Sequence, residues 1–588
     1  MKKAIWMAVC CVMAFSLIFA SCGGDEDSGD EGGKEVESQY RDPEEPKYGG
    51  TYTDLTMGDP NGFDPRVVMN LMCPTIWITH DELLTGDWAK GPAGTGETDW
   101  QLGFLGQISL LSGKLADSWE LPDDETIIYN LKQGVHFSYD QNNNNEASRL
   151  VNGREMTAED VAWSLESEWF APGMNEAVFF LPEQWIISAK ALDRYTVEIK
   201  TPANSQGTNL CESGERISIF APEVTEKWGD QNDLEHSVGI SAWILEDYIS
   251  GSSITYTRNP NYHLFDPIHP ENQLPYLDVY KQLIIPDSST QQASFRTGKI
   301  DMMVGVSWEN KELLLKDCPE MKYIDTYGMG LVPCGRMDKD LPFNDIKVMQ
   351  AMNMAVNQQE LVDDYYQGNA QLVGWPFYDI VAHTPFYTPL EEMPEICQEI
   401  YGFYPEKAKR LLTEAGYPDG FKTTIACVQN HVDLLSIIKN YLADVGIDME
   451  LQVLEGSIFN GVNRGRTHDE MIMKETKMYS MPWHMFEVRA DNADGVAFYE
   501  RPQTRAVYET INNYLGRDDT VWIKALKDIV PFMIEDPWGI YLPIAETDTM
   551  WWPWMQNFRG ETSIGNFTPA THVMYTWVDQ EMKTAMGY

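Results

Sequence analysis

The stretch from Leu115 to Leu165 constrains the fold most, because strand, turn and helix signals follow one another within it. Trp119-Glu120-Leu121 is typical of a short strand, and the turn residues Pro122 to Glu125 come next. Thr126 to Lys132 then alternates and is rich in β-favouring side chains. The sequence therefore predicts a β-hairpin at the start of this stretch.

A capped helix is predicted at the end of the same stretch. Thr157 can accept a hydrogen bond from the backbone N–H of Asp160, and acidic side chains suit the positive first turn of a helix. Val161, Leu165 and Trp169 fall on one helical face. We therefore expect an amphipathic helix to begin near Ala158.

The residue identities of this stretch are more informative than its hydrophobic periodicity. Leu115–Phe137 and Asn152–Ser164 resemble a signature of the family 5 extracytoplasmic solute-binding proteins, the oligopeptide- and nickel-binding group of ABC importers. Further runs resemble the same family and are spread from Gly49 to the end of the chain: Gly49–Leu55, Phe63–Pro65, His80–Leu84, Gly251–His263, Pro275–Asp278, Ser294–Asp301, Pro342–Val348, Tyr404–Tyr417 and Trp551–Trp554.

The resemblance implies an α/β, two-lobed, hinged periplasmic-binding-protein-like fold of the large cluster C type. Residues 49–282 would form the first lobe, with an inserted subdomain at about 85–190. Residues 283–545 would form the second lobe, and 546–588 would return to the first. The length of 588 residues independently favours more than one core.

Residues Met349–Tyr366 carry an apolar stripe and are expected to form one helix.

The N-terminus carries the marks of export. Residues 1–22 begin with two lysines, continue with the apolar run Ala4–Leu17 and end in Phe19-Ala20-Ser21-Cys22. This ending resembles the bacterial lipobox, which implies acylation of Cys22. Residues 23–48 are acidic and Gly-rich, and they predict a flexible tether. We expect an extracytoplasmic monomer that is held at the membrane only by its lipid anchor.

The amino-acid composition restricts the classes of partner that this protein is expected to bind. The formal net charge of −47 argues against nucleic acid, whose phosphates require a basic surface. A hydrophobic fraction of 43% is ample for large cores. The acidity itself is interpreted as a solvated surface and identifies no ligand.

Motifs of enzymes, cofactors and metal sites are missing from the sequence. There is no G-x-S-x-G, H-E-x-x-H, Walker or post-strand G-x-G-x-x-G pattern, so neither catalysis nor a cofactor is expected. His80-Asp81-Glu82 has no second histidine nearby and is assigned a surface or packing role. Asp140–Glu146 lacks the Gly and Glu of a calcium loop and is interpreted as a polar loop.

Cysteines offer no metal motif either. Six lie beyond the processing segment without C-x-x-C spacing, and their number permits disulfides without revealing a pairing. They are Cys73, Cys211, Cys318, Cys334, Cys397 and Cys427.

Candidate ligand contacts follow from the resemblance. Trp243 stands where the family usually carries a Gly-Thr-Gly-Pro-Tyr cleft wall. Trp483 to Asp494 occupies the region in which peptide-binding members carry an aspartate for the ligand ammonium, so either Asp491 or Asp494 is the candidate, with surface acids as an equal alternative. Trp88 and Trp100 either rim the cleft or pack in a core, and packing is favoured.

Three functions remain open on the sequence alone. The favoured one is a receptor that captures oligopeptides by lobe closure and delivers them to permease subunits with an associated ATPase. The second keeps the fold but binds a metal chelate, a sugar or a signalling peptide. The third is a secreted hydrolase with a nucleophile built from residues that are remote in sequence.

Overall fold

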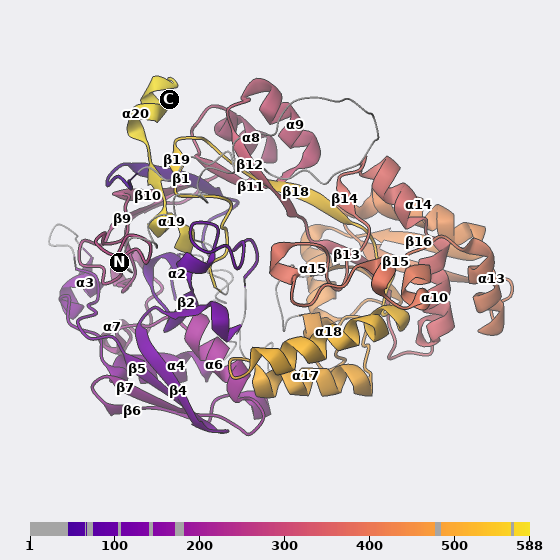
Figure 1. The fold of residues 1–588 in the computed structure, drawn as a ribbon, viewed down its shortest axis with the longest axis horizontal. Coiled ribbons are helices and arrows are strands. Elements are labelled where there is room, and N and C mark those ends of the chain that lie inside the picture. The colour runs from indigo at the N-terminus through magenta and orange to yellow at the C-terminus, as the bar shows by residue number, and fades with distance from the viewer. Residues whose placement is uncertain are drawn as a thin grey trace, which may run out of the picture. The chain divides into compact units, whose positions relative to one another are not determined.

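The computed structural model describes residues 45–64, 66, 75–103, 107–139, 145–170, 182–476, 484–565 and 570–588. Within them lie four four-stranded sheets, with helices packed against them (Figure 1). Among the described residues, no helix combines the length and the apolar composition that a membrane span requires.

The first sheet joins the start of the folded chain to its middle. Its order is β1-β10-β9-β8, and β1 lies parallel to β10 while the other neighbours are antiparallel. Its strands are β1 (Thr51–Thr56), β8 (Trp243–Ile249), β9 (Ser253–Arg258) and β10 (Val279–Ile284). Strand β1 thus needs a partner more than 200 residues away, and the sheet depends on tertiary contacts.

The second sheet contains the predicted hairpin, which is confirmed. Its order is β4-β5-β7-β6, and α4 packs on it. Thr157 and Asp160 form a capping box at the start of α4, in which the backbone N–H of Thr157 donates to the Asp160 carboxylate at 2.8 Å. The elements are β4 (Ala116–Asp123), β5 (Thr126–Leu131), α3 (Glu146–Val151), α4 (Ala158–Trp169), β6 (Ser188–Asp193), β7 (Thr196–Lys200), α6 (Gln206–Glu215) and α7 (Pro222–Trp228).

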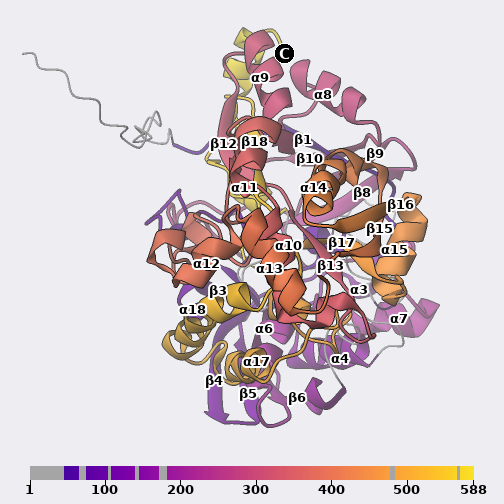
Figure 2. The same cartoon turned by 90° about the vertical axis from the view of Figure 1, so that its right-hand side faces the viewer.

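The third sheet has the order β13-β17-β15-β16 and contains parallel pairs. Helix α14 connects β15 to β16 and packs on the sheet, as Figure 2 shows. The elements are β13 (Gly330–Gly335), α10 (Ile346–Ala355), α13 (Pro405–Glu414), β15 (Phe421–Cys427), α14 (Val432–Asp444), β16 (Ile447–Val453) and β17 (Met471–Thr476).

The single helix predicted for Met349–Tyr366 is wrong. Helix α10 ends at Ala355, and Val356 is extended. Asn357 then caps a new short helix, α11 (Gln358–Glu360), by accepting from the backbone N–H of Glu360 at 3.2 Å. The capping asparagine starts a new helix here, although the apolar stripe continues across the break between the two helices.

The fourth sheet has the order β11-β18-β12, and β14 also pairs with β18. Its strands are β11 (Met302–Ser307), β12 (Lys322–Tyr327), β14 (Ala370–Gln371) and β18 (Ile544–Trp551). Strand β12 leads directly into β13 of the third sheet, and β18 leads into the C-terminal segment. This sheet therefore lies where the chain passes between the other sheets (Figure 1).

Short elements and further helices complete the fold. They are α2 (Ile76–Thr79), β2 (Leu84–Gly86), β3 (Leu111–Gly113), α8 (Ser288–Arg296), α9 (Trp308–Asp317), α12 (Glu395–Ile400), α15 (Gly456–Gly465), α16 (His484–Glu487), α17 (Pro502–Tyr514), α18 (Asp519–Glu535), β19 (Met555–Gln556), α19 (Thr571–Tyr575), β20 (Trp577–Val578) and α20 (Gln580–Ala585). Helix α17 contacts α6, and Thr208 Oγ1 donates to Asn512 Oδ1 at 2.8 Å between them.

The segment of residues 87–103 that follows β2, called the insertion below, is organised around Trp100. This side chain is fully buried, and a Cβ at Gly86 or Gly91 would collide with its indole. Trp88 is buried as well and stacks on Tyr575 at 4.5 Å. The interpretation that both tryptophans pack in a core is confirmed, and their burial brings the following residues of the insertion onto the fourth sheet.

Candidate functional site

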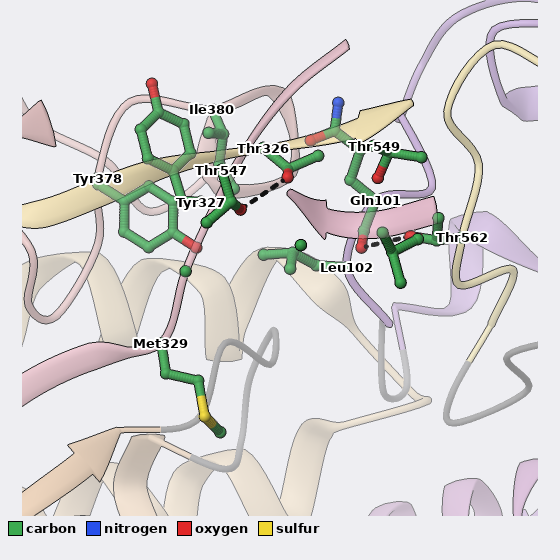
Figure 3. Close-up of a pocket in the computed structure, with 13 residues that line it drawn as sticks. Gln101, Leu102, Thr326, Tyr327, Met329, Tyr378, Ile380, Thr547, Thr549 and Thr562 are labelled. Atoms are coloured by element: carbon green, nitrogen blue, oxygen red, sulfur yellow. Dashed lines mark hydrogen bonds between the residues drawn. The ribbon is translucent and has the colours of Figure 1, made fainter. Parts of the chain in front are cut away.

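A cavity of about 370 Å³ lies against the fourth sheet (Figure 3). Its walls come from the insertion, β11, β12, β18, the segment after β14 and the segment after β19. The lining residues are Gln101, Leu102, Val304, Gly305, Thr326, Tyr327, Gly328, Met329, Tyr378, Ile380, Thr547, Thr549 and Thr562. Gly328 and Met329 belong to the crossing from β12 to β13, so the cavity lies beside a point where the chain changes sheets.

Strand alternation decides which side chains of β18 reach the cavity. Thr547 and Thr549 line it, whereas Glu546 and Asp548 point to the opposite face, toward Lys311 of α9. Successive side chains of a strand point to opposite faces, so one strand separates a neutral surface from a charged one.

The cavity wall carries hydroxyls and no charge. None of its lining residues is Asp, Glu, Lys, Arg or His. Thr326 and Thr547 lie opposite each other on neighbouring strands, and their Oγ1 atoms are 3.0 Å apart (Figure 3). Thr562 Oγ1 donates to the carbonyl of Gln101 at 3.3 Å. The arrangement suits an uncharged ligand group that combines apolar surface with hydrogen-bonding atoms.

Tyr378 supplies a buried polar atom of the wall. Its side chain is only 3% exposed, and its hydroxyl has no hydrogen-bond partner among the described residues. Figure 3 shows this hydroxyl directed toward the cavity, while the hydroxyl of Tyr327 points away from it. Tyr327 Oη instead accepts from Gln371 Nε2 at 2.6 Å.

The charged face of β18 holds three carboxylates around one ammonium. Oxygens of Asp325, Glu546 and Asp548 lie within 4.8 Å of one another. Lys311 Nζ is 3.1, 3.0 and 2.9 Å from these three carboxylates. Burial raises the pKa of Asp548 to about 7, although Lys311 opposes the shift. The lysine already supplies the positive charge that this cluster requires.

A second charged group is buried in the first half of the chain. Asp81, Glu82 and Lys114 are each at most 1% exposed. Lys114 Nζ lies 2.9 Å from the Asp81 carboxylate and 2.8 Å from that of Glu82. Tyr262 Oη donates to Asp81 at 2.9 Å. The expected packing role of His80-Asp81-Glu82 is confirmed, and the expected surface role is wrong because Lys114 allows the acids to be buried.

Trp243 lies in a core and does not line the cavity. It is 2% exposed, begins β8 and contacts Tyr280 edge to face at 5.8 Å. The bulky side chain at this position therefore packs against the first sheet. Its contact with a ligand stays a prediction.

Both candidate aspartates are engaged by basic side chains. Asp491 accepts from Arg489 Nε and from Arg505, each at 3.0 Å. Burial raises the pKa of Asp491, but the hydrogen bonds and charges of Arg489 and Arg505 outweigh it and leave the pKa below its usual value. Lys474 Nζ lies 3.6 Å from Asp494. Neither aspartate lines the cavity, and their choice as the ammonium contact stays a prediction.

Several predictions fall outside the described residues, namely those on Cys22, Cys73, Trp483 and most of Asp140–Glu146. Asn145, at the described end of that loop, donates to the carbonyls of Leu234 and Ser237 at 2.8 and 2.7 Å. The five described cysteines are free and buried, so no disulfide forms among them.

Sequence reasoning missed every residue of the cavity wall. One signal was available: in Ala545-Glu546-Thr547-Asp548-Thr549 acids and threonines alternate, which is typical of a strand with two different polar faces. The alternation predicts the two faces but does not indicate that one of them borders a cavity. That depends on where the Trp100 insertion lies.

The sequence pattern described as bacterial extracellular solute-binding proteins, family 5 Middle, matches residues 111–495. Heme-binding protein A of Haemophilus influenzae is 26% identical over 324 residues, which are 53% of this chain and 54% of the relative. The glutathione-binding protein GsiB of Salmonella paratyphi A is 25% identical over 275 residues, or 46% and 49% of the two chains. The chain thus spans about half the length of these curated relatives.

Solved structures show the same fold over most of the chain. The periplasmic binding protein DppA of Helicobacter pylori, in complex with the peptide STSA, has a TM-score of 0.67 at 20% identity, covering 91% of this chain and 99% of its own. The oligopeptide-binding protein AppA of Bacillus subtilis, in complex with a nonapeptide, has a TM-score of 0.66 at 16% identity, covering 91% and 100%. The predicted two-lobed α/β fold of periplasmic binding proteins is confirmed.

Proposed function

Because the chain belongs to the bacterial extracellular solute-binding proteins of family 5, we propose that it is the substrate-binding receptor of an ABC importer and that it captures oligopeptides. The observation that carries the peptide assignment is the uncharged, hydroxyl-lined cavity of about 370 Å³ beside the strand crossing. Peptide groups are uncharged hydrogen-bonding units with apolar neighbours, and such a wall matches them.

The proposed mechanism is ligand binding by lobe closure, without a chemical reaction. Lobes formed by residues 49–282 with 546–588 and by 283–545 close over the peptide and exclude water. The closed form then docks on permease subunits whose ATPase drives import. A ligand favours closure only by its greater affinity for the closed form. Asp491 or Asp494, with Trp483, would contact the peptide from the second lobe, and Trp243 would contribute from the first.

We further propose that the protein is a lipid-anchored monomer. Acylation of Cys22 would fasten the chain to the membrane, and the acidic segment 23–48 would let the folded part reach the permease. The Cys22→Ser variant should leave the membrane fraction and appear in the soluble fraction. If it stays membrane-bound while the wild type carries no lipid by mass spectrometry, the anchor is wrong.

A different solute is the second candidate, and the names of two relatives favour keeping it. Those relatives are called heme-binding and glutathione-binding proteins. Glutathione is itself peptide-like, whereas heme would need a larger apolar space than the cavity wall alone offers.

Native mass spectrometry of gently purified protein tests the assignment. A heterogeneous set of peptide masses released on denaturation would support oligopeptide capture and define the range of lengths. One discrete non-peptide mass would keep the receptor function and replace the ligand. A bare protein whose melting temperature is unchanged by a peptide pool would refute oligopeptide capture.

A further inference from the structure

Tyr378 is exceptional in the cavity because its hydroxyl is buried and unpaired at once. The side chain is 3% exposed, and no described residue accepts from or donates to its Oη atom. Buried hydroxyls in folded proteins nearly always have a partner, since an unpaired one loses its hydration without replacement. An unpaired hydroxyl that faces a cavity is therefore a place where a ligand atom gains a hydrogen bond that the empty protein lacks.

Ring contacts, and no hydrogen bond, hold this hydroxyl in place. The Tyr378 ring lies 5.1 Å from that of Tyr327 and 4.6 Å from the His383 imidazole, which meets it edge to face. The His383 Nδ1 atom lies 3.3 Å from the Tyr378 carbonyl. The aromatic packing fixes the direction of the hydroxyl before any ligand arrives, so little freedom is lost on binding.

The hydroxyl stays protonated across the physiological range. Burial raises the pKa of Tyr378, and the neighbouring Tyr327 and Asp99 raise it further. A neutral phenol both donates and accepts one hydrogen bond. It can pair with an amide carbonyl, an amide N–H or a hydroxyl.

Three threonine hydroxyls of the wall are already engaged. Thr326 and Thr547 pair with each other at 3.0 Å, and Thr562 donates to a backbone carbonyl. Leu102 and Met329 add apolar surface, and Met329 is 49% exposed at the edge of the cavity. A charged ligand group entering here would lose water and meet no opposite charge among the lining residues.

We propose that Tyr378 is a specificity-determining residue whose hydroxyl anchors an uncharged hydrogen-bonding group of the ligand, an amide or a hydroxyl, and that the cavity rejects cationic and anionic groups. This inference rests on the proposed peptide function. It deepens that function by naming the chemical class of the bound group and the atom that recognises it.

The test compares Tyr378→Phe with wild type by calorimetric titration of tripeptides. The tripeptides consist of alanine with glutamine, lysine or glutamate at one position, and every position is sampled. Wild type should bind the glutamine-containing peptides. For at least one position, the peptides with lysine or glutamate should bind at least about 10-fold more weakly than the peptide with glutamine at that position. Tyr378→Phe should weaken the best glutamine peptide by about 3- to 10-fold.

Thermal stability separates recognition from a structural role. Because the Tyr378 hydroxyl has no partner in the protein, Tyr378→Phe should melt at the wild-type temperature or slightly above it. The matched control is Tyr541→Phe, which removes a buried hydroxyl that donates to the Met533 carbonyl at 2.8 Å. That variant should melt lower and bind peptides as wild type does.

Each outcome decides the question. Equal affinity of charged and neutral peptides at every position, or unchanged affinity of Tyr378→Phe, would overturn this inference and leave peptide capture standing. A lower melting temperature with unchanged affinity would make Tyr378 merely structural. Failure of wild type to bind any peptide would overturn the proposed function and this inference with it.

Discussion

Two buried polar regions of this protein solve the same physical problem in opposite ways. In the Asp81, Glu82 and Lys114 cluster, the lysine lies within 2.9 Å of both acids. In the cavity, the Tyr378 hydroxyl is left without a partner among the described residues. Burial of polar groups costs free energy unless they are paired. A buried polar group thus gains its partner either from within the fold, as Lys114 does, or, as we propose for Tyr378, from a ligand.

Removing the cation of the paired cluster should produce the largest effect. Lys114→Met leaves two acids buried without a cation and should lower the free energy of unfolding by about 3–5 kcal/mol. Urea unfolding measures the change. Lys90→Met is the matched control, because Lys90 pairs at 3.1 Å with the exposed Glu97 and should cost less than about 1 kcal/mol. Equal losses in the two variants would contradict the comparison.

Glu561 lies between the two extremes, since it is buried but paired only weakly. It is fully buried and accepts from the backbone N–H of Arg559 at 2.6 Å, next to Thr562 of the cavity wall. Burial raises its pKa to about 7, although the Arg559 N–H and charge oppose the shift. The folded protein thus holds a proton that the unfolded chain, with a glutamate pKa of about 4.3, has already released.

The sign of the pH effect follows from proton binding. Between pH 4.5 and 7 the unfolded state binds fewer protons at this position, so stability falls as the pH rises. The Glu561 contribution, about 3 kcal/mol, is fully present below pH 4.5 and is lost by pH 7. Glu561→Gln should remove this part of the decline, measured as urea unfolding at pH 5 and 8. A variant whose decline equals that of wild type would refute the assignment.

The threonine pair on the cavity wall should give a smaller effect. Thr547→Val leaves the Thr326 hydroxyl without its 3.0 Å partner and should cost about 1 kcal/mol. The double variant with Thr326→Val should recover part of that loss, because no hydroxyl then remains unpaired. Chemical unfolding of the four proteins measures the coupling. Strict additivity of the two single effects would show that the pair contributes nothing.

The smallest stability effect is expected for Tyr378→Phe, which should not lower the unfolding free energy at all. Differential scanning calorimetry of the ligand-free protein checks this expectation. A loss above about 1 kcal/mol would place the hydroxyl with the paired groups and erase the contrast between the two regions.

Local signals explain which parts of the fold were predictable. The β4–β5 hairpin and the start of α4 follow from alternation, turn residues and an acid at the third helical position, all of which act over a few residues. The same reasoning failed at Val356, because a helical stripe runs on through Asn357 while the capping side chain starts a new helix. Hydrophobic periodicity indicates which face of a helix is buried, but it does not indicate whether the helix is continuous.

The class of fold, the family and the alternation that separates the two faces of β18 follow from the amino-acid sequence alone. These features can be inferred from local patterns or from motifs of several residues. Long-range contacts, by contrast, place Lys114 between Asp81 and Glu82 and bring the insertion onto the fourth sheet beside the cavity. They also leave the Tyr378 hydroxyl without a partner among the described residues. These facts depend on contacts between residues remote in sequence, and no local pattern encodes which partner a buried polar atom will meet.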